Sequence, residues 1–181
     1  MGEPNSKNSD ELGAFAAALK LSRFGVGRHI VRDERGWRDR EIQVRSIWLV
    51  TISPSFDPSA YLMVMHAEAQ PLSLFCLRGI DSMPRIKGEP FECPGLDDRV
   101  AKSLKHVDLF PSGGGISLDG IGYSLRIRTS AVSADLQFSN PKTESLKAVE
   151  RAIFDVAESI ARITERPDIS DYLKIWKKYL N

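Results

Sequence analysis

Residues 123–164 read YSLRIRTSAVSADLQFSNPKTESLKAVERAIFDVAESIARIT, and this stretch decides the fold class. Its first two arms, 123–128 and 132–139, alternate apolar and polar residues, which is typical of an antiparallel hairpin with one solvated face. Apolar residues then recur at three- and four-residue spacing, as they do on one face of a helix. They are Leu146, Val149, Ile153, Val156, Ile160 and Ile163. The stretch therefore predicts a hairpin followed by a helix of about five turns, with charged residues on the opposite side of the helix.

The residues around this helix predict where it begins and ends. Asn140 is expected to cap it, because a short side-chain oxygen accepts a hydrogen bond from a free N–H of the first turn. Pro141 suits the first helical position, where no N–H is needed. Pro167 is expected to end the helix, and a last helix is expected to follow with its cap at Asp168 or Ser170.

The chain before this stretch predicts several more strands and two further helices. The expected elements are a helix over 10–22, a hairpin with arms 26–33 and 42–52 around a polar connector 34–40, strands over 61–67 and 72–77, and a short helix over 97–106. Strict alternation places Val44 on the same face as Trp48 and Val50. Beyond Ile47 both faces of this arm are apolar, so that end is expected to be buried on both sides.

The order of these elements predicts the fold class. It lacks the regular alternation of strand and helix that builds a parallel sheet. We therefore expect an α+β fold, in which an antiparallel sheet is packed on one face by the long helix of the C-terminal third, with N-terminal and C-terminal helices. Residues 1–8 are expected to form a disordered tail and 9–181 a single domain. The Pro- and Gly-rich 79–111 region is a candidate boundary between lobes.

Composition excludes several classes of protein. The chain has 181 residues, of which 42% are hydrophobic and 27% charged, as in a globular protein with its own core. Its 25 Lys and Arg balance 24 Asp and Glu, which disfavours a globally basic nucleic-acid-binding protein. No membrane contact is expected, because no apolar run approaches about eighteen residues. The N-terminus has no pattern of a signal peptide, so a cytoplasmic protein is expected.

Motifs for catalysis or metal binding are not found in the sequence. The glycines at 113–115 lack the lysine and the spacing of a phosphate-binding loop. His29, expected on a strand surface, has no partner at metal-ligand spacing, and neither do His66 and His106. We therefore predict no catalytic residue, no metal and no cofactor. An enzyme would need a site assembled from distant residues, such as His66, Cys76 and His106.

An Arg-rich hairpin is the least average feature of the sequence. Residues 20–45 hold eight basic and four acidic residues, for a local charge of +4. Arginine pairs with carboxylates and phosphates through a planar fork, and tryptophan, here Trp37 at the predicted tip, is favoured in interfaces. The predicted binding residues are Arg32, Arg35, Trp37, Arg38 and Arg40, with Trp176 and Tyr179 as a second candidate surface. The alternative for the hairpin is a solvated surface on which its acids pair with its arginines. The alternative for Trp176 and Tyr179 is a last helix that packs on the domain.

These features favour a non-enzymatic protein-binding module. One form is a bacterial immunity or inhibitor protein whose Arg/Trp hairpin covers an acidic surface of a protein partner. A nucleic-acid-associated factor using the same hairpin is an alternative, although the interspersed acids disfavour it. An enzyme assembled from distant residues is a second alternative, and a homodimer is compatible with each binding surface.

Overall fold

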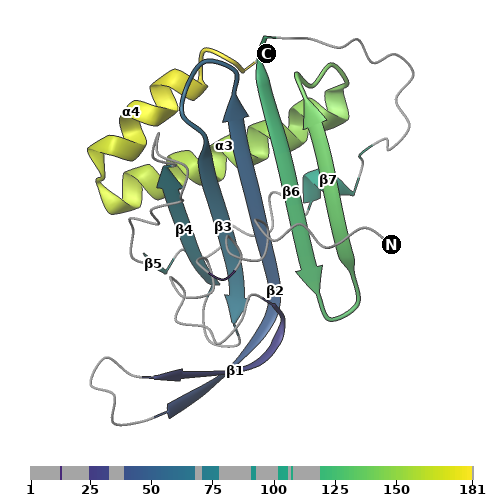
Figure 1. Cartoon of the computed structure of the whole chain (residues 1–181), viewed down its shortest axis with the longest axis vertical. Coiled ribbons are helices and arrows are strands. Elements are labelled where there is room, and N and C mark those ends of the chain that lie inside the picture. The colour runs from purple at the N-terminus through teal and green to yellow at the C-terminus, as the bar shows by residue number, and fades with distance from the viewer. Residues whose placement is uncertain are drawn as a thin grey trace.

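The computed structural model describes residues 13, 25–32, 39–67, 71–77, 91–92, 102–105, 107 and 119–180. An antiparallel sheet is packed on one face by helices α3 (Glu144–Thr164) and α4 (Pro167–Trp176), as Figure 1 shows. This arrangement confirms the predicted α+β fold. No helix in the described part of the chain is long and apolar enough to cross a membrane. The predicted tail over 1–8, almost all of the predicted helix over 10–22 and most of the 79–111 region lie outside the described residues.

One sheet contains the seven strands of the described residues, in the order β5-β4-β3-β2-β6-β7, with β1 paired to β2. The strands are β1 (Gly27–Arg32), β2 (Asp39–Pro54), β3 (Ala60–Ala67), β4 (Pro71–Leu77), β5 (Phe91–Glu92), β6 (Ile121–Thr129) and β7 (Ser133–Ser139). Val44 of β2 pairs with Gly27 of β1 and with Ala67 of β3, so β1 lies on the same edge of β2 as β6. The predicted hairpins and strands are thus confirmed, each within a few residues.

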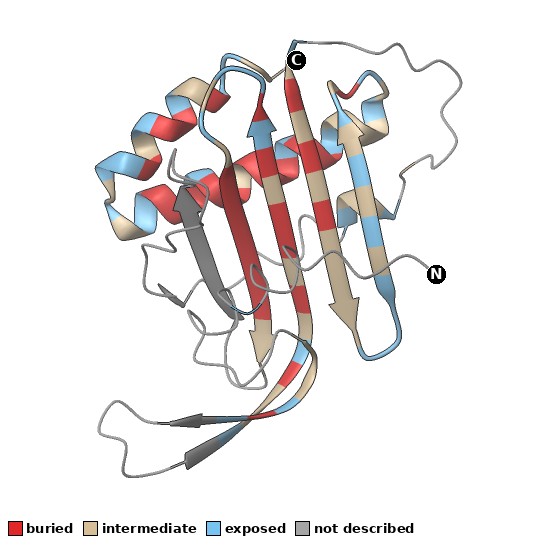
Figure 2. Ribbon diagram, viewed as in Figure 1, coloured by how far each residue is buried: buried red, intermediate tan, exposed pale blue. Residues whose placement is uncertain are grey.

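The main core lies between the sheet and the two helices. Along β6 buried residues alternate with half-buried ones, because successive side chains point to opposite faces; Figure 2 shows this as red and tan bands. Four of the predicted apolar residues of α3 are buried in this core, namely Val149, Ile153, Val156 and Ile160. Ile163 departs from the prediction, since it is 53% exposed in the last turn of α3.

A second apolar set is buried on the face of the sheet that points away from α3 and α4. It consists of Ile47 and Leu49 of β2 with Tyr61, Met63 and Met65 of β3. All five side chains are at most 2% exposed, and β3 is red along most of its length in Figure 2. The expectation that this end of the strand is buried on both sides is therefore confirmed.

Because of a β-bulge at Arg45, Val44 lies on the opposite face of the sheet from the one predicted. Val44 pairs with Ala67 and Ser46 with His66, so two steps along β2 match one step along β3. Paired residues point to the same side, which places Val44 with Ile47 rather than with Trp48. The extra residue of the bulge reverses which side chains of β2 before it point to each face. No local sequence pattern indicates this extra residue.

The bulge also explains why His29 is not the surface residue that the sequence predicted. His29 pairs with Ile42, so it shares the face of Ile42 and Val44. Its side chain is 1% exposed, and its Nε2 lies 2.9 Å from the carbonyl oxygen of Gly25. His29 is therefore a buried histidine that contacts the backbone just before its own strand.

The ends of both helices differ from the prediction. Helix α3 is capped by Thr143, whose Oγ1 accepts from the N–H of Leu146, whereas Asn140 lies before the helix with φ of 44°. Asn140 is one of the few residues that tolerate this left-handed conformation, and here it makes the turn that leads to the helix. Helix α4 begins at Pro167 with Arg166 as its N-cap, so Pro167 starts the last helix and Asp168 lies inside it.

Candidate binding surfaces

One end of β2 forms a two-stranded ribbon with β1. Residues 39–43 of β2 pair with β1 and with no other described strand, because β3 begins to pair at Val44 and β6 at Ser46. We call β1 together with residues 39–43 the ribbon. It bends away from the rest of the sheet near the bulge, as Figure 1 shows, and bulges are known to redirect strands in this way.

Two of the predicted hairpin residues, Arg32 and Arg40, lie on the ribbon. Arg32 pairs with Asp39 and Arg40 with Val31, so the backbones of both arginines lie at the far end of the ribbon. Arg35, Trp37 and Arg38 belong to the connector over 33–38 and lie outside the described residues. The structure therefore places two of the five predicted hairpin residues and leaves the role of all five a prediction.

The outer face of the ribbon is charged and partly apolar. Arg28 Nε lies 3.2 Å from Glu41 Oε1, and their side chains are 80% and 60% exposed. Ile30, two residues along from Arg28, is 62% exposed. The Arg28–Glu41 pair is of the kind that a solvated hairpin would contain. A partner that covered the exposed Ile30 beside it would remove apolar surface from water.

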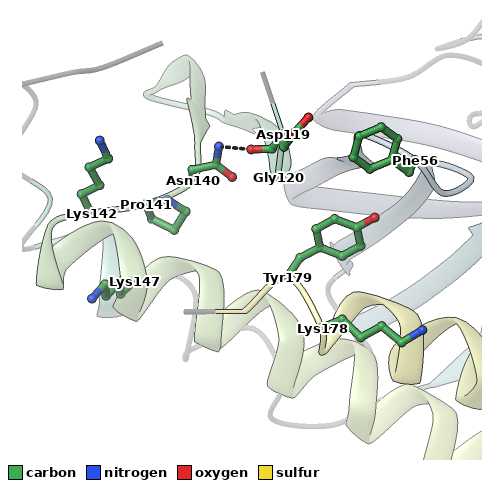
Figure 3. Close-up of a pocket in the computed structure, with 9 residues that line it drawn as sticks. All are labelled: Phe56, Asp119, Gly120, Asn140, Pro141, Lys142, Lys147, Lys178 and Tyr179. Carbon is green, nitrogen blue, oxygen red and sulfur yellow. Dashed lines mark hydrogen bonds between the residues drawn. The ribbon is translucent and has the colours of Figure 1, made fainter. Parts of the chain in front are cut away.

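The opposite end of β2 borders a hollow of about 590 Å³, shown in Figure 3. Its walls come from the β2–β3 loop, the turn before β6, the connection from β7 to α3, the first turn of α3 and the segment after α4. The lining residues are Phe56, Asp119, Gly120, Asn140, Pro141, Lys142, Lys147, Lys178 and Tyr179. Segments far apart in the sequence thus meet at this end of the sheet.

Asn140 and Gly120 build the rigid wall of the hollow. Asn140 Oδ1 accepts from the N–H of Ile121 at 2.8 Å, and its Nδ2 donates to the carbonyl of Asp119 at 2.9 Å. Gly120 has φ of +137°, and a Cβ placed on it would lie 1.7 Å from Asn140 Oδ1. Position 120 therefore requires glycine both for its backbone conformation and for the close approach of the Asn140 amide.

Two aromatic residues form the apolar part of the hollow. Tyr179 is half-buried and donates through its Oη to Asp57 Oδ2 at 2.7 Å, which fixes the ring beside the β2–β3 loop. This bond to a carboxylate raises the pKa of Tyr179. Phe56 is 76% exposed, the highest value among the exposed large hydrophobic residues of the described chain. The hollow therefore presents one fixed and one open aromatic ring.

Three lysines surround these rings. Lys147 lies 3.5 Å from Glu144 Oε1, while Lys142 and Lys178 form no ion pair with a described residue. In Figure 3, Lys142 and Lys147 stand at one end of the hollow and Lys178 at the other, with the amine of Lys178 directed outward. The positive charges therefore frame the hollow and do not converge on one point. Asp119 is the acid among its lining residues.

The second predicted binding pair, Trp176 and Tyr179, is divided between two environments. Tyr179 lines the hollow, whereas Trp176 is 0% exposed and its ring packs edge-on against Phe154 with centroids 5.0 Å apart. Trp176 Nε1 donates to Tyr123 Oη at 2.8 Å, and Tyr123 Oη donates to Glu150 Oε1 at 2.7 Å. Trp176 therefore belongs to the core, as the packing alternative expected.

Glu150 is a buried residue that the sequence analysis missed. It is 2% exposed, although the charged residues of α3 were expected on the opposite side of the helix. A signal was present, because position 150 lies four residues after Leu146 and three before Ile153, on the apolar face. Burial, followed by the charge of Glu150, raises the pKa of Tyr123 well above that of an exposed tyrosine.

The residues named for an assembled enzyme site do not come together on β3 and β4. His66 pairs with Pro71 and Cys76 with Tyr61, so five residues of strand, or roughly 17 Å, separate the two along the ladder. His106 lies outside the described residues. Within the described ranges no group of three His, Cys, Asp or Glu side chains is placed to hold a metal ion.

Comparisons of the chain with protein-family models, with curated proteins and with solved structures found no match.

Proposed function

We propose that this chain is a non-enzymatic protein-binding module that covers an acidic surface of a protein partner with its β1–β2 hairpin, as an immunity or inhibitor protein would. One observation carries the proposal. The ribbon leaves the sheet at the bulge, and residues 39–43 pair with β1 alone among the described strands. An arm of this kind can present both its strands to another molecule.

Physical chemistry supports a partner for such an arm. A two-stranded ribbon is only marginally stable by itself in water. The ribbon nevertheless exposes Ile30 by 62% and sets Arg28 beside it. A partner surface that is acidic and partly apolar would satisfy the arginines and cover the isoleucine. Arginine and tryptophan are also the residue types that contribute most to binding energy in interfaces.

A pull-down with the full tagged chain from native lysate, with and without nuclease, tests the proposal. We expect one protein to be captured in stoichiometric amount in both arms, and to be lost when Arg35, Trp37 and Arg38 are all replaced by alanine. A matched control is Arg151→Ala with Arg162→Ala, which removes two positive charges from exposed positions on α3. The control should retain the partner.

Two outcomes would contradict this function. Equal capture by the hairpin variant and by the unmodified chain would show that the hairpin does not carry the contact. Loss of all captured material on nuclease treatment would favour the nucleic-acid alternative, for which binding should fall steeply with salt.

A further inference from the structure

We propose that the hollow at the other end of β2 is a separate binding site, which takes an acidic peptide segment with an apolar side chain seated between Phe56 and Tyr179. β2 has 16 residues, so at about 3.3 Å per residue its two ends are roughly 50 Å apart along the strand. The hollow is therefore independent of the ribbon, and this proposal holds whether or not the hairpin binds a partner.

The charge of the hollow selects for an acidic ligand. Lys142, Lys147 and Lys178 line it together with one acidic residue, Asp119, and Lys147 is also paired with Glu144 at 3.5 Å. Lys142 and Lys178 have no ion-pair partner among the described residues, so their charges are available to a ligand. Lys142 also lies just before the α3 N-terminus, where the free N–H groups of the first turn add to the positive potential.

The arrangement of the lysines favours an extended ligand over a compact anion. A bound phosphate needs several donors that converge on its oxygens. Here the lysines stand at the two ends of the hollow, with Asn140, Pro141 and Tyr179 between them (Figure 3). An extended chain with acidic side chains on both sides of a central residue matches this spacing of charge.

The aromatic rings select for an apolar central side chain. Phe56 is 76% exposed, so a ligand side chain that covers it removes apolar surface from water. Tyr179 is held by its hydrogen bond to Asp57, so this wall is already in place before a ligand binds. A fixed ring costs little conformational entropy on binding, which makes the hollow a prepared contact surface.

Fluorescence anisotropy with the full chain tests the site. The probe is a labelled peptide in which one leucine is flanked on each side by glutamates; the same peptide with serine for leucine is its matched control. We expect the leucine peptide to bind in low salt, and Lys142→Gln with Lys178→Gln to weaken it roughly tenfold, because two charge contacts are lost. Phe56→Ser should weaken it roughly fivefold.

Control variants separate this site from general charge and from the hairpin. Lys174→Gln with Arg162→Gln removes two charges from exposed positions outside the hollow and should leave binding within about twofold. The alanine variant of Arg35, Trp37 and Arg38 should bind the peptide as the unmodified chain does. Failure of the hairpin proposal and failure of this one are thus distinguishable.

Three results would overturn the inference. The first is that the leucine peptide shows no binding at concentrations up to about 1 mM, which corresponds to a very weak site. The second is that the leucine and serine peptides bind equally, which would mean that the aromatic rings have no role. The third is that pyrophosphate or ATP binds more tightly than the peptide, with the same dependence on Lys142 and Lys178. That result would make the hollow a site for small anions.

Discussion

The two ends of β2 differ in what holds them. At the ribbon end the strand has one described neighbour, β1, and the described side chains of its outer face lie in solvent. At the hollow end the strand lies between β3 and β6, and Ser55 after it is bonded to Gly120 by its N–H at 2.8 Å. The same strand thus serves as a projecting arm at one end and as part of a fixed wall at the other.

This difference shows which interactions should respond to mutation. The hollow end is connected to the core, because Tyr179 follows Trp176 by three residues and Trp176 is bonded to Tyr123. The ribbon end has no such connection among the described residues beyond the β1–β2 ladder and the buried His29. Changes to the buried residues that join the hollow end to the core should therefore alter the stability of the whole fold, and changes to the exposed side chains of the ribbon should not.

The largest effect is expected from Trp176→Ala, which tests whether the hollow end depends on the core. It removes a fully buried ring that contacts Phe154 and Tyr123, so the free energy of unfolding should fall by about 3–5 kcal/mol. Denaturant unfolding followed by circular dichroism measures this change. Trp176→Phe keeps most of the ring volume and loses the bond to Tyr123, so it should cost less. A loss below about 1 kcal/mol for the alanine variant would place Trp176 outside the core.

Alkaline pH should produce the next largest effect, again through the core and not through the ribbon. Burial raises the pKa of Tyr123 and of Tyr172 above 10.0, and Tyr172 also faces the charge of Asp57. The folded protein therefore holds these protons more tightly than the unfolded chain does. Their contribution to stability is complete below about pH 10 and is lost as the pH rises, by about 1.4 kcal/mol per pH unit for each tyrosine.

Unfolding curves recorded between about pH 9 and about pH 11 measure this loss. For the unmodified chain we expect roughly 1–3 kcal/mol by pH 11 from the two tyrosines together. Tyr123→Phe and Tyr172→Phe should each remove about half of the part of the alkaline slope that these two tyrosines supply. If both variants lose stability at high pH as steeply as the unmodified chain does, the slope has another source.

The sequence predicted the fold better than it predicted the sites, for a physical reason. Periods of two and of about 3.6 residues record which side of a strand or helix is buried, so the strands and α3 could be located from residues such as Leu125 and Ile153. A bulge breaks the period without changing composition, which is why the face of Val44 and the burial of His29 were mispredicted.

The hollow could not be predicted, because it depends on register. Phe56, Gly120 and Tyr179 are far apart in the chain, and only the pairing of β2 with β6 brings two of their loops together. Asn140 illustrates the same limit at short range. Asn-Pro is a common start of a helix, but Asn also tolerates a positive φ, and here the tertiary contact with Ile121 selects the second use.

The smallest effect is expected on the ribbon, from the Arg28–Glu41 pair. Both side chains are more than half exposed, so water and salt screen their attraction. A double-mutant cycle with Arg28→Ala and Glu41→Ala should give a coupling free energy of at most about 0.5 kcal/mol in denaturant unfolding. A coupling free energy of about 2 kcal/mol is in the range of a buried ion pair. Such a value would mean that the ribbon is held as firmly as the hollow end. In that case the difference between the two ends of β2 would lie in their chemistry alone, and the ribbon would be a rigid surface for its partner before binding.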